Sequence, residues 1–226
     1  MAWIRAVLAC LLLSAFGAGG ARPAAALSDQ QELVEKCRIT FEKLITSPEF
    51  KQLPDYVKRS KAVLIFPALV KGGFILGAEG GSGVLVVRNL EKGWSYPAFY
   101  TLLVGSLGLQ IGGQLSEVVF TVMNDGAVEA LLKDQMQFGG NMSIAVGPLG
   151  AGLQAATTTN LESDVYSFAK TAGLFGGVSF DGAGVLKRDE WNEGYYAKGA
   201  TPYDIVIARK FSNPNADGLR KALEPY

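Results

Sequence analysis

The most informative absence in this 226-residue sequence is histidine, of which there is none. Histidine is the usual general base near neutral pH and the commonest transition-metal ligand. Its absence excludes Ser-His-Asp and Cys-His catalytic arrangements, and it leaves paired carboxylates as the main acid–base alternative. The carboxylates that lie close together, Asp181, Asp189, Glu190 and Glu193, are typical of a solvated loop and a helix start. The sequence therefore favours a protein that is not an enzyme and holds no cofactor or metal.

Cysteine is also scarce, because the chain has only Cys10 and Cys37. Cys10 lies in a segment that we expect to be removed, so one thiol remains and no intramolecular disulfide can form. Cys37 falls at an apolar position of a predicted helix and has no acid–base partner close in sequence. We therefore interpret it as a small buried hydrophobe and not as a nucleophile.

Net charge is missing as well, since 21 basic residues balance 21 acidic residues. Nucleic-acid-binding domains are usually clearly basic, so this balance argues against that class. It also argues against attraction of the whole molecule to an anionic membrane. Any electrostatic contact with a membrane must therefore come from a local cluster of charges.

The first 26 residues have the three-part layout of a secretory signal peptide. Met1–Arg5 carries one positive charge, Ala6–Phe16 is an apolar run, and Ala24–Ala26 forms an A-x-A cleavage site. The apolar run is shorter than the ~20 residues that span a bilayer. We therefore expect an exported protein, periplasmic or extracellular and either free or peripheral to a membrane. We expect it to begin at Leu27 and to form a single domain over 27–226.

Helical patterns come first in this domain. Ser28 and Gln31 are spaced as a capping box, in which each side chain bonds the other residue's backbone N–H. Apolar residues then recur at helical spacing through Ile45, and Pro48 closes that helix and opens a short second one. Asp55–Lys61 predicts one or two further helical turns.

Strand patterns follow from Ala62 onward. Ala62–Phe66 is a buried-strand run that we expect to stop at Pro67, and the strands Phe74–Glu79 and Val84–Arg88 flank Gly80–Gly83 as in a hairpin. Glycine makes up 28 of 226 residues, above the usual ~7%, and much of it lies inside predicted strands. Such glycines permit bulges and close backbone approach. The predicted class is α+β, with N-terminal helices packed on a strongly curved, mostly antiparallel, Gly-rich sheet.

Several short motifs follow one another in an order and spacing that are specific when taken together. They are Lys61-Ala62, Ile65-Phe66-Pro67, Lys71-Gly72-Gly73-Phe74, Gly80-Gly81-Ser82-Gly83, Trp94-Ser95-Tyr96-Pro97, Gly112-Gly113-Gln114, Gly139-Gly140-Asn141, Ala145-Val146-Gly147-Pro148, Tyr166-Ser167, Gly173–Ser179, Arg188-Asp189 and Asn192. In this order they resemble the SYLF domains, over about Leu33 to Tyr196. The resemblance includes the exported single-domain members found in bacteria.

This resemblance implies a lipid-binding module. Eukaryotic SYLF domains bind phosphoinositides and, in some fungal members, actin. Here we expect an anionic phospholipid such as phosphatidylglycerol or cardiolipin, because bacterial envelopes generally lack phosphoinositides and an exported protein would not meet actin. The alternative is a structural or protein-interaction domain of the envelope that has no specific lipid ligand.

The residues that could contact lipid are few. Lys58, Arg59 and Lys61 form the densest basic cluster, and Lys71 is predicted to lie near it. The apolar face of the helix Asp29–Ile45 could either pack on the sheet or insert at a membrane interface. Four aromatic residues could also sit at an interface, although such side chains more often fill cores: Trp94, Trp191, Tyr195 and Tyr196.

The leader generates the first testable prediction. Protein recovered from the periplasmic fraction should begin at Leu27, because the A-x-A motif ends at Ala26. N-terminal sequencing measures this directly. Retention of Met1, or a lipid attached to Cys10, would contradict it.

Overall fold

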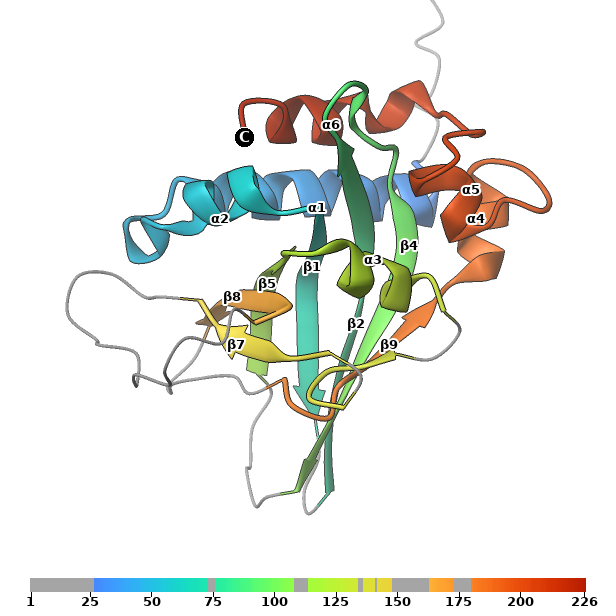
Figure 1. The fold of residues 1–226 in the computed structure, drawn as a ribbon. Helices are drawn as coiled ribbons and strands as arrows, with labels where there is room; N and C mark the ends of the chain where they lie inside the picture. Colours follow the sequence, from blue (N-terminus) through green and yellow to red (C-terminus); the bar gives the residue numbers. More distant parts are fainter. Residues whose placement is uncertain are drawn as a thin grey trace, which may run out of the picture.

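The computed structural model describes residues 27–72, 76–107, 114–133, 136–140, 142–147, 163–172 and 180–226 (Figure 1). The helices are α1 (Asp29–Ile45), α2 (Leu53–Arg59), α3 (Asp125–Leu131), α4 (Asp189–Tyr195), α5 (Pro202–Val206) and α6 (Asp217–Leu223), with 3-10 turns η1 (Pro48–Phe50) and η3 (Pro214–Ala216). The strands are β1 (Ala62–Gly72), β2 (Leu76–Asn89), β3 (Gly93–Trp94), β4 (Ala98–Leu107), β5 (Gln114–Val122), β6 (Met136–Gln137), β7 (Ile144–Val146), β8 (Val165–Ala172) and β9 (Gly184–Lys187).

The strands form one strongly curled sheet in the order β6-β9-β4-β2-β1-β5-β8-β7, and β3 pairs with β2. Every pairing is antiparallel except that of β7 with β8. Alternate residues of the central strand enter different cores. Val63 and Ile65 pack with α1, α2 and α6, whereas Leu64 and Phe66 pack with α3 and α5. The predicted α+β class and curved sheet are confirmed.

Helix α1 begins as predicted, but only half of the capping box forms. The Ser28 hydroxyl accepts a hydrogen bond from the Gln31 N–H at 3.2 Å. The Gln31 side chain turns elsewhere: its Nε2 donates to the Asn215 carbonyl at 2.9 Å, and its Oε1 accepts from the Tyr195 hydroxyl at 2.6 Å. The glutamine therefore ties the start of α1 to the C-terminal segment, a long-range role that local spacing does not reveal.

The apolar face of α1 packs on the sheet and is not available to a membrane. Its side chains Leu33, Val34, Cys37, Phe41, Leu44 and Ile45 are all buried. Of the two alternatives for this helix, core packing is therefore confirmed. Among the described residues, no helix combines the length and apolar character needed to cross a bilayer.

Strand β1 does not stop at Pro67, so that prediction is wrong. The strand runs on to Gly72, with a bulge where the register shifts against both neighbours. Phe66 pairs with Val118 and Leu69 with Ser116, so Pro67 and Ala68 together face the single residue between those partners on β5. A central strand tolerates proline only where the ladder is interrupted, because proline has no N–H to donate.

The predicted hairpin at Gly80–Gly83 is also wrong, because these residues lie inside the continuous strand β2. Their glycines allow the backbone of β1 to approach closely. A Cβ at Gly81 would lie 2.1 Å from the Ala68 carbonyl oxygen, and one at Gly83 would lie 2.3 Å from that of Ile65. The glycine-rich run therefore accommodates the bulge of β1.

Some predicted strands cannot be compared with the structure. The sequence pattern also predicts strands at Leu149–Thr157 and Leu174–Phe180 and an alternating strand from Leu107 to Gly112. All of the first and most of the other two lie outside the described residues, as does the leader 1–26. Elements that the sequence pattern did not predict are also present, among them β4, β9 and α5.

The close approach of β1 and β2 generates the second prediction. Gly81→Ala should lower the free energy of unfolding by about 1–3 kcal/mol, because the added methyl group meets backbone that cannot rotate away. Urea denaturation measures the change. Gly184→Ala in β9 is the matched control, since a Cβ there meets nothing within 4 Å. Equal stability of the two variants would contradict the close-approach explanation.

Candidate functional site

The structure brings the predicted cluster of three basic residues together where α2 meets β1. Lys58 and Arg59 occupy the last turn of α2 and are exposed. The Arg59 guanidinium lies 4.8 Å from the ring centroid of Tyr56. Lys61 precedes β1, and its Nζ lies 3.4 Å from an Asp125 carboxylate oxygen at the start of α3. Cations at a helix C-terminus also stabilise the helix, so their position alone does not identify a site.

Lys71 lies far from these three residues. It sits near the other end of β1, where its backbone pairs with Glu79 and Gln114. Ten residues of strand separate it from Lys61, a distance of about 33 Å at the usual strand rise. The four residues predicted from the sequence therefore do not form a single cluster, and the Lys71 side chain lies outside the described part of the structure.

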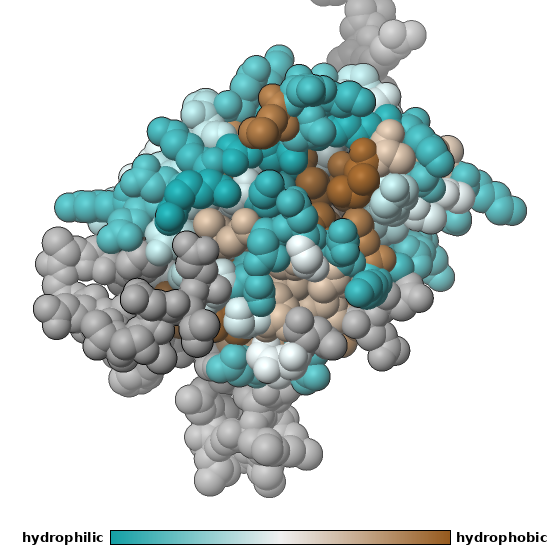
Figure 2. All heavy atoms as spheres, viewed as in Figure 1, coloured by the Kyte–Doolittle hydropathy of each residue, from teal (hydrophilic) through white to brown (hydrophobic). Residues whose placement is uncertain are grey.

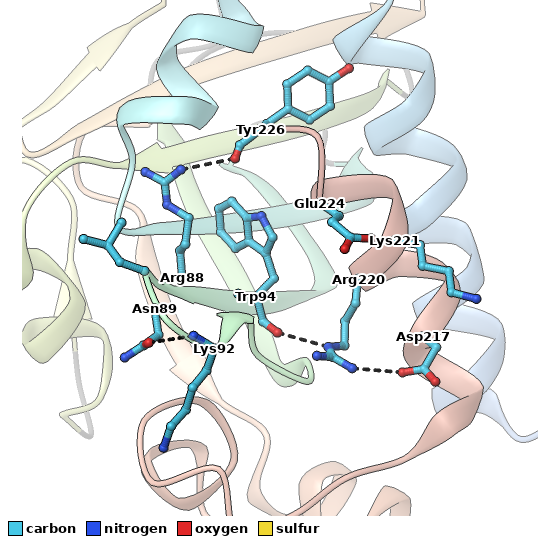
Figure 3. A pocket seen from close by; sticks show the side chains of 11 residues that line it. Arg88, Asn89, Lys92, Trp94, Asp217, Arg220, Lys221, Glu224 and Tyr226 are labelled. Carbon is cyan, nitrogen blue, oxygen red and sulfur yellow. Dashed lines mark hydrogen bonds and ion pairs between the residues drawn. The ribbon is translucent and has the colours of Figure 1, made fainter.

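A surface pocket of about 460 Å³ adjoins the cluster, between the turn after β2 and helix α6 (Figure 3). Arg88 connects the two features. Its guanidinium donates to the carbonyl oxygens of Lys58 and, at 3.2 Å, of Tyr226. It also lies 5.5 Å from the ring centroid of Trp94, whose buried indole lines the pocket. The end of α2 and the pocket are thus parts of one surface.

This surface also contains a cation held by hydrogen bonds, Arg220 on α6, and two lysines that extend outward, Lys221 on α6 and Lys92 in the turn after β2. Arg220 is fixed: its Nε donates to the Trp94 carbonyl at 3.0 Å, and its Nη1 pairs with Asp217 at 3.0 Å. Lys221 and Lys92 extend away from Trp94 toward the outside (Figure 3). Within the described part of the chain, neither lysine lies within 4.0 Å of a carboxylate oxygen.

We call this surface the basic end, and define it by Lys58, Arg59, Arg88, Lys92, Arg220 and Lys221. Three carboxylates accompany these six cations, those of Glu91, Asp217 and Glu224. Burial lowers the pKa of Arg88. Burial, and secondarily the charge of Arg220, lower the pKa of the neighbouring Arg209. The second effect is repulsion between the Arg209 and Arg220 guanidinium groups.

Sequence reasoning missed most of the basic end because its residues come from separate segments. Arg88 and Lys92 flank a turn, whereas Arg220 and Lys221 lie more than a hundred residues later on α6. No run of charges in the sequence marks them. The one local signal was the polar turn Asn89–Gly93 between a strand and Trp94.

The other candidate groups are held in structural roles. The Glu193 carboxylate accepts a hydrogen bond from the Gly199 N–H at 2.9 Å, and Asp189 and Glu190 lie exposed in the first turn of α4. Of the aromatic residues considered, Trp94 and Tyr195 are buried, and Trp191 and Tyr196 are half-buried. No group of three or more His, Cys, Asp or Glu side chains in the described residues could hold a metal ion.

Comparison with known proteins gives consistent matches. The family model of Ysc84, described as "Las17-binding protein actin regulator", matches residues 104–226. The chain is 32% identical over 177 residues to the human "SH3 domain-containing YSC84-like protein 1", covering 78% of this chain and 52% of that protein. It is 35% identical over 176 residues to "Protein YSC84" of Saccharomyces cerevisiae, covering 76% of this chain and 37% of that protein. The chain thus spans about half, or less, of the length of these relatives.

The environment of Cys37 generates the third prediction. The thiol is fully buried, donates to the Ile65 carbonyl at 3.4 Å, and has its pKa raised by burial. Because only the thiolate reacts, iodoacetamide at pH 8 should leave Cys37 unmodified in the folded protein and modify it in urea. Peptide mass spectrometry locates the label. Rapid labelling of the folded protein, or a turnover that Cys37→Ala abolishes, would contradict the structural role.

Proposed function

This chain belongs to the Ysc84 family, the family of the SYLF domains, and we propose that it is a non-enzymatic module that binds anionic phospholipid membranes through its basic end. We further propose that it does so as an exported protein of the bacterial envelope. The observation that carries the proposal is the gathering of cations at one end of a chain whose net charge is zero.

The arrangement of these cations supports a broad, shallow contact with a charged surface. Lys58, Lys92 and Lys221 have no ion pair within the described residues, so their charges are not neutralised locally. Each basic side chain near an anionic lipid surface contributes about 1 kcal/mol. Three such side chains therefore give weak but measurable binding without a deep site.

Arg88 and Arg220 support the proposal in a different way. Both are held by backbone carbonyls, and Arg220 is also held by Asp217, so they fix the walls of the pocket. A fixed guanidinium loses little conformational entropy when a phosphate approaches, and its planar fork suits phosphate oxygens. Lys58, Lys92 and Lys221 would then contact lipid around these two fixed arginines.

A protein-interaction function is the alternative, and the names of the relatives favour it. A second yeast relative, 32% identical over 174 residues, is named "LAS seventeen-binding protein 3". A partner protein with an acidic surface could use the same basic end. Vesicle flotation tests the lipid function directly, because a lipid-binding surface must hold anionic vesicles in the absence of any partner protein.

The fourth prediction tests the lipid proposal by flotation with vesicles of phosphatidylglycerol and phosphatidylcholine. The full chain should float with these vesicles and not with pure phosphatidylcholine. Replacing Lys58, Arg59 and the adjoining Lys61 with Gln should weaken binding on the order of 10- to 100-fold. About 1 kcal/mol is lost for each of the two basic-end contacts, whereas Lys61 is already paired with Asp125. Lys92→Gln/Lys221→Gln should weaken it about tenfold or more.

The matched control is the triple variant Lys71→Gln/Lys133→Gln/Lys198→Gln, which removes three cations outside the basic end. It should bind nearly as well as the wild-type protein. Raising the salt from about 0.1 M to 1 M should weaken binding, because the Debye length falls from about 10 Å to 3 Å. If the wild-type protein floats equally with neutral and anionic vesicles, or with neither, the electrostatic proposal is wrong. If the wild-type protein binds neither kind of vesicle, the protein-interaction function is favoured.

A further inference from the structure

Leu90 stands out on the surface of the basic end. Its side chain is 93% exposed, whereas the next most exposed large hydrophobics, Leu27 and Val70, reach 63% and 58%. Leu90 lies in the turn between β2 and β3 and lines the pocket with Arg88 and Lys92. Single exposed leucines are common on protein surfaces, so the exposure alone means little. What distinguishes Leu90 is that hydrogen bonds hold its turn in one conformation.

The turn that carries Leu90 is held rigidly from within. The Asn89 side-chain oxygen accepts hydrogen bonds from the N–H groups of Glu91 and Lys92, each at 2.9 Å. Gly93 closes the turn at φ +67°, a conformation that glycine adopts without strain. Asn89 pairs with Gly93 and Arg88 with Trp94 in the β2–β3 ladder that flanks the turn. Leu90 is thus presented at the tip of a closed loop.

A distant segment also clamps this turn from outside. Arg209 Nη1 donates to the Lys92 carbonyl at 3.0 Å, and its Nη2 donates to the Gly93 carbonyl at 2.6 Å. Arg209 is the one non-glycine residue among the described residues with a positive φ, +54°. Such backbone strain persists only where surrounding contacts enforce it. The fold therefore fixes the turn in place while leaving the leucine in water.

Charge surrounds the exposed leucine. Arg88 precedes it by two residues and contacts Lys58, Lys92 follows it by two, and Glu91 is the one carboxylate in the turn. Figure 2 shows a small hydrophobic patch among hydrophilic atoms at the end of the molecule where this turn lies in Figure 1. An exposed leucine flanked by Arg88 and Lys92 is complementary to an anionic bilayer, whose headgroups lie outside its acyl chains.

We propose that Leu90 is a membrane anchor, which inserts at the boundary of headgroups and acyl chains when the basic end meets an anionic bilayer. This inference rests on the proposed function and adds the apolar component of the same contact. Because the turn is already fixed, insertion orders little backbone, and most of the free energy of burying the leucine is available for binding. This component does not depend on ionic strength.

The first test is vesicle partitioning of Leu90→Ser at about 0.1 M and 1 M salt. The variant should bind about tenfold more weakly than wild type at both salts, and Leu90→Phe should restore binding. Lys92→Gln/Lys221→Gln should instead lose binding mainly at low salt. Leu115→Ser is the matched control, because Leu115 is 45% exposed and pairs with Val70 at the opposite end of β1.

The second test locates the side chain directly. Leu90→Cys is labelled with an environment-sensitive fluorophore in a Cys10→Ser background, where buried Cys37 stays unlabelled. Fluorescence should rise on anionic vesicles and be quenched by spin labels on the upper acyl chain, whereas a label introduced by Leu115→Cys should not respond. If wild-type protein binds vesicles but Leu90→Ser binds equally well, or the label at position 90 stays in water, the anchor is wrong and the proposed function stands. If wild-type protein binds no vesicles, the proposed function itself fails.

Discussion

The close approach of β1 and β2 is the constraint on which the rest of the structure depends. The bulge at Pro67 and Ala68 pushes carbonyl oxygens into the space that side chains at Gly81 and Gly83 would fill. A bulge in the central strand bends the sheet. Successive side chains of β1 point to opposite faces and so enter two separate cores, one on each face. One core holds α1, and through it α6, in place beside the strands. The pocket exists because α6 lies against the turn after β2.

Burial of the apolar face of α1 changes where a membrane contact can arise. With Leu33 and Phe41 inside the core, that helix has no apolar face to insert. The exposed apolar surface of the basic end is instead a single leucine on a clamped turn, surrounded by cations from three segments. A surface of this kind suits reversible association, because a few charges and one leucine contribute much less than an amphipathic helix of several turns.

The features that the sequence predicted correctly are local ones. The cap at Ser28, the helical spacing through Ile45 and the α+β class each depend on residues close in the chain. The predictions at Pro67 and Gly80–Gly83 were wrong because proline and glycine are local signals for turns. In the folded chain the bulge at Pro67 fits against the glycines of the paired strand, which have no side chains to obstruct it. The basic end was predicted only in part, because most of its residues lie far apart in the sequence. Lys58 and Arg59 are neighbours in sequence, but only the folded chain brings Arg220 and Lys221 to Arg88.

Family membership and charge distribution explain different aspects of this protein. The family match extends from the second half of β4 through α6, so it covers part of the sheet and the helices α3 to α6. The matched region makes up 52% of the human relative and 37% of the yeast relative, so a large part of each of those proteins lies outside the similarity. In a chain with equal numbers of basic and acidic residues, binding to a charged surface depends on segregation of charge and not on its sum. The fold achieves that segregation by holding α2, the turn after β2 and α6 at one end of a curled sheet. Long-range contacts such as that of Arg88 with Lys58 and that of Arg209 with Lys92 hold these segments together.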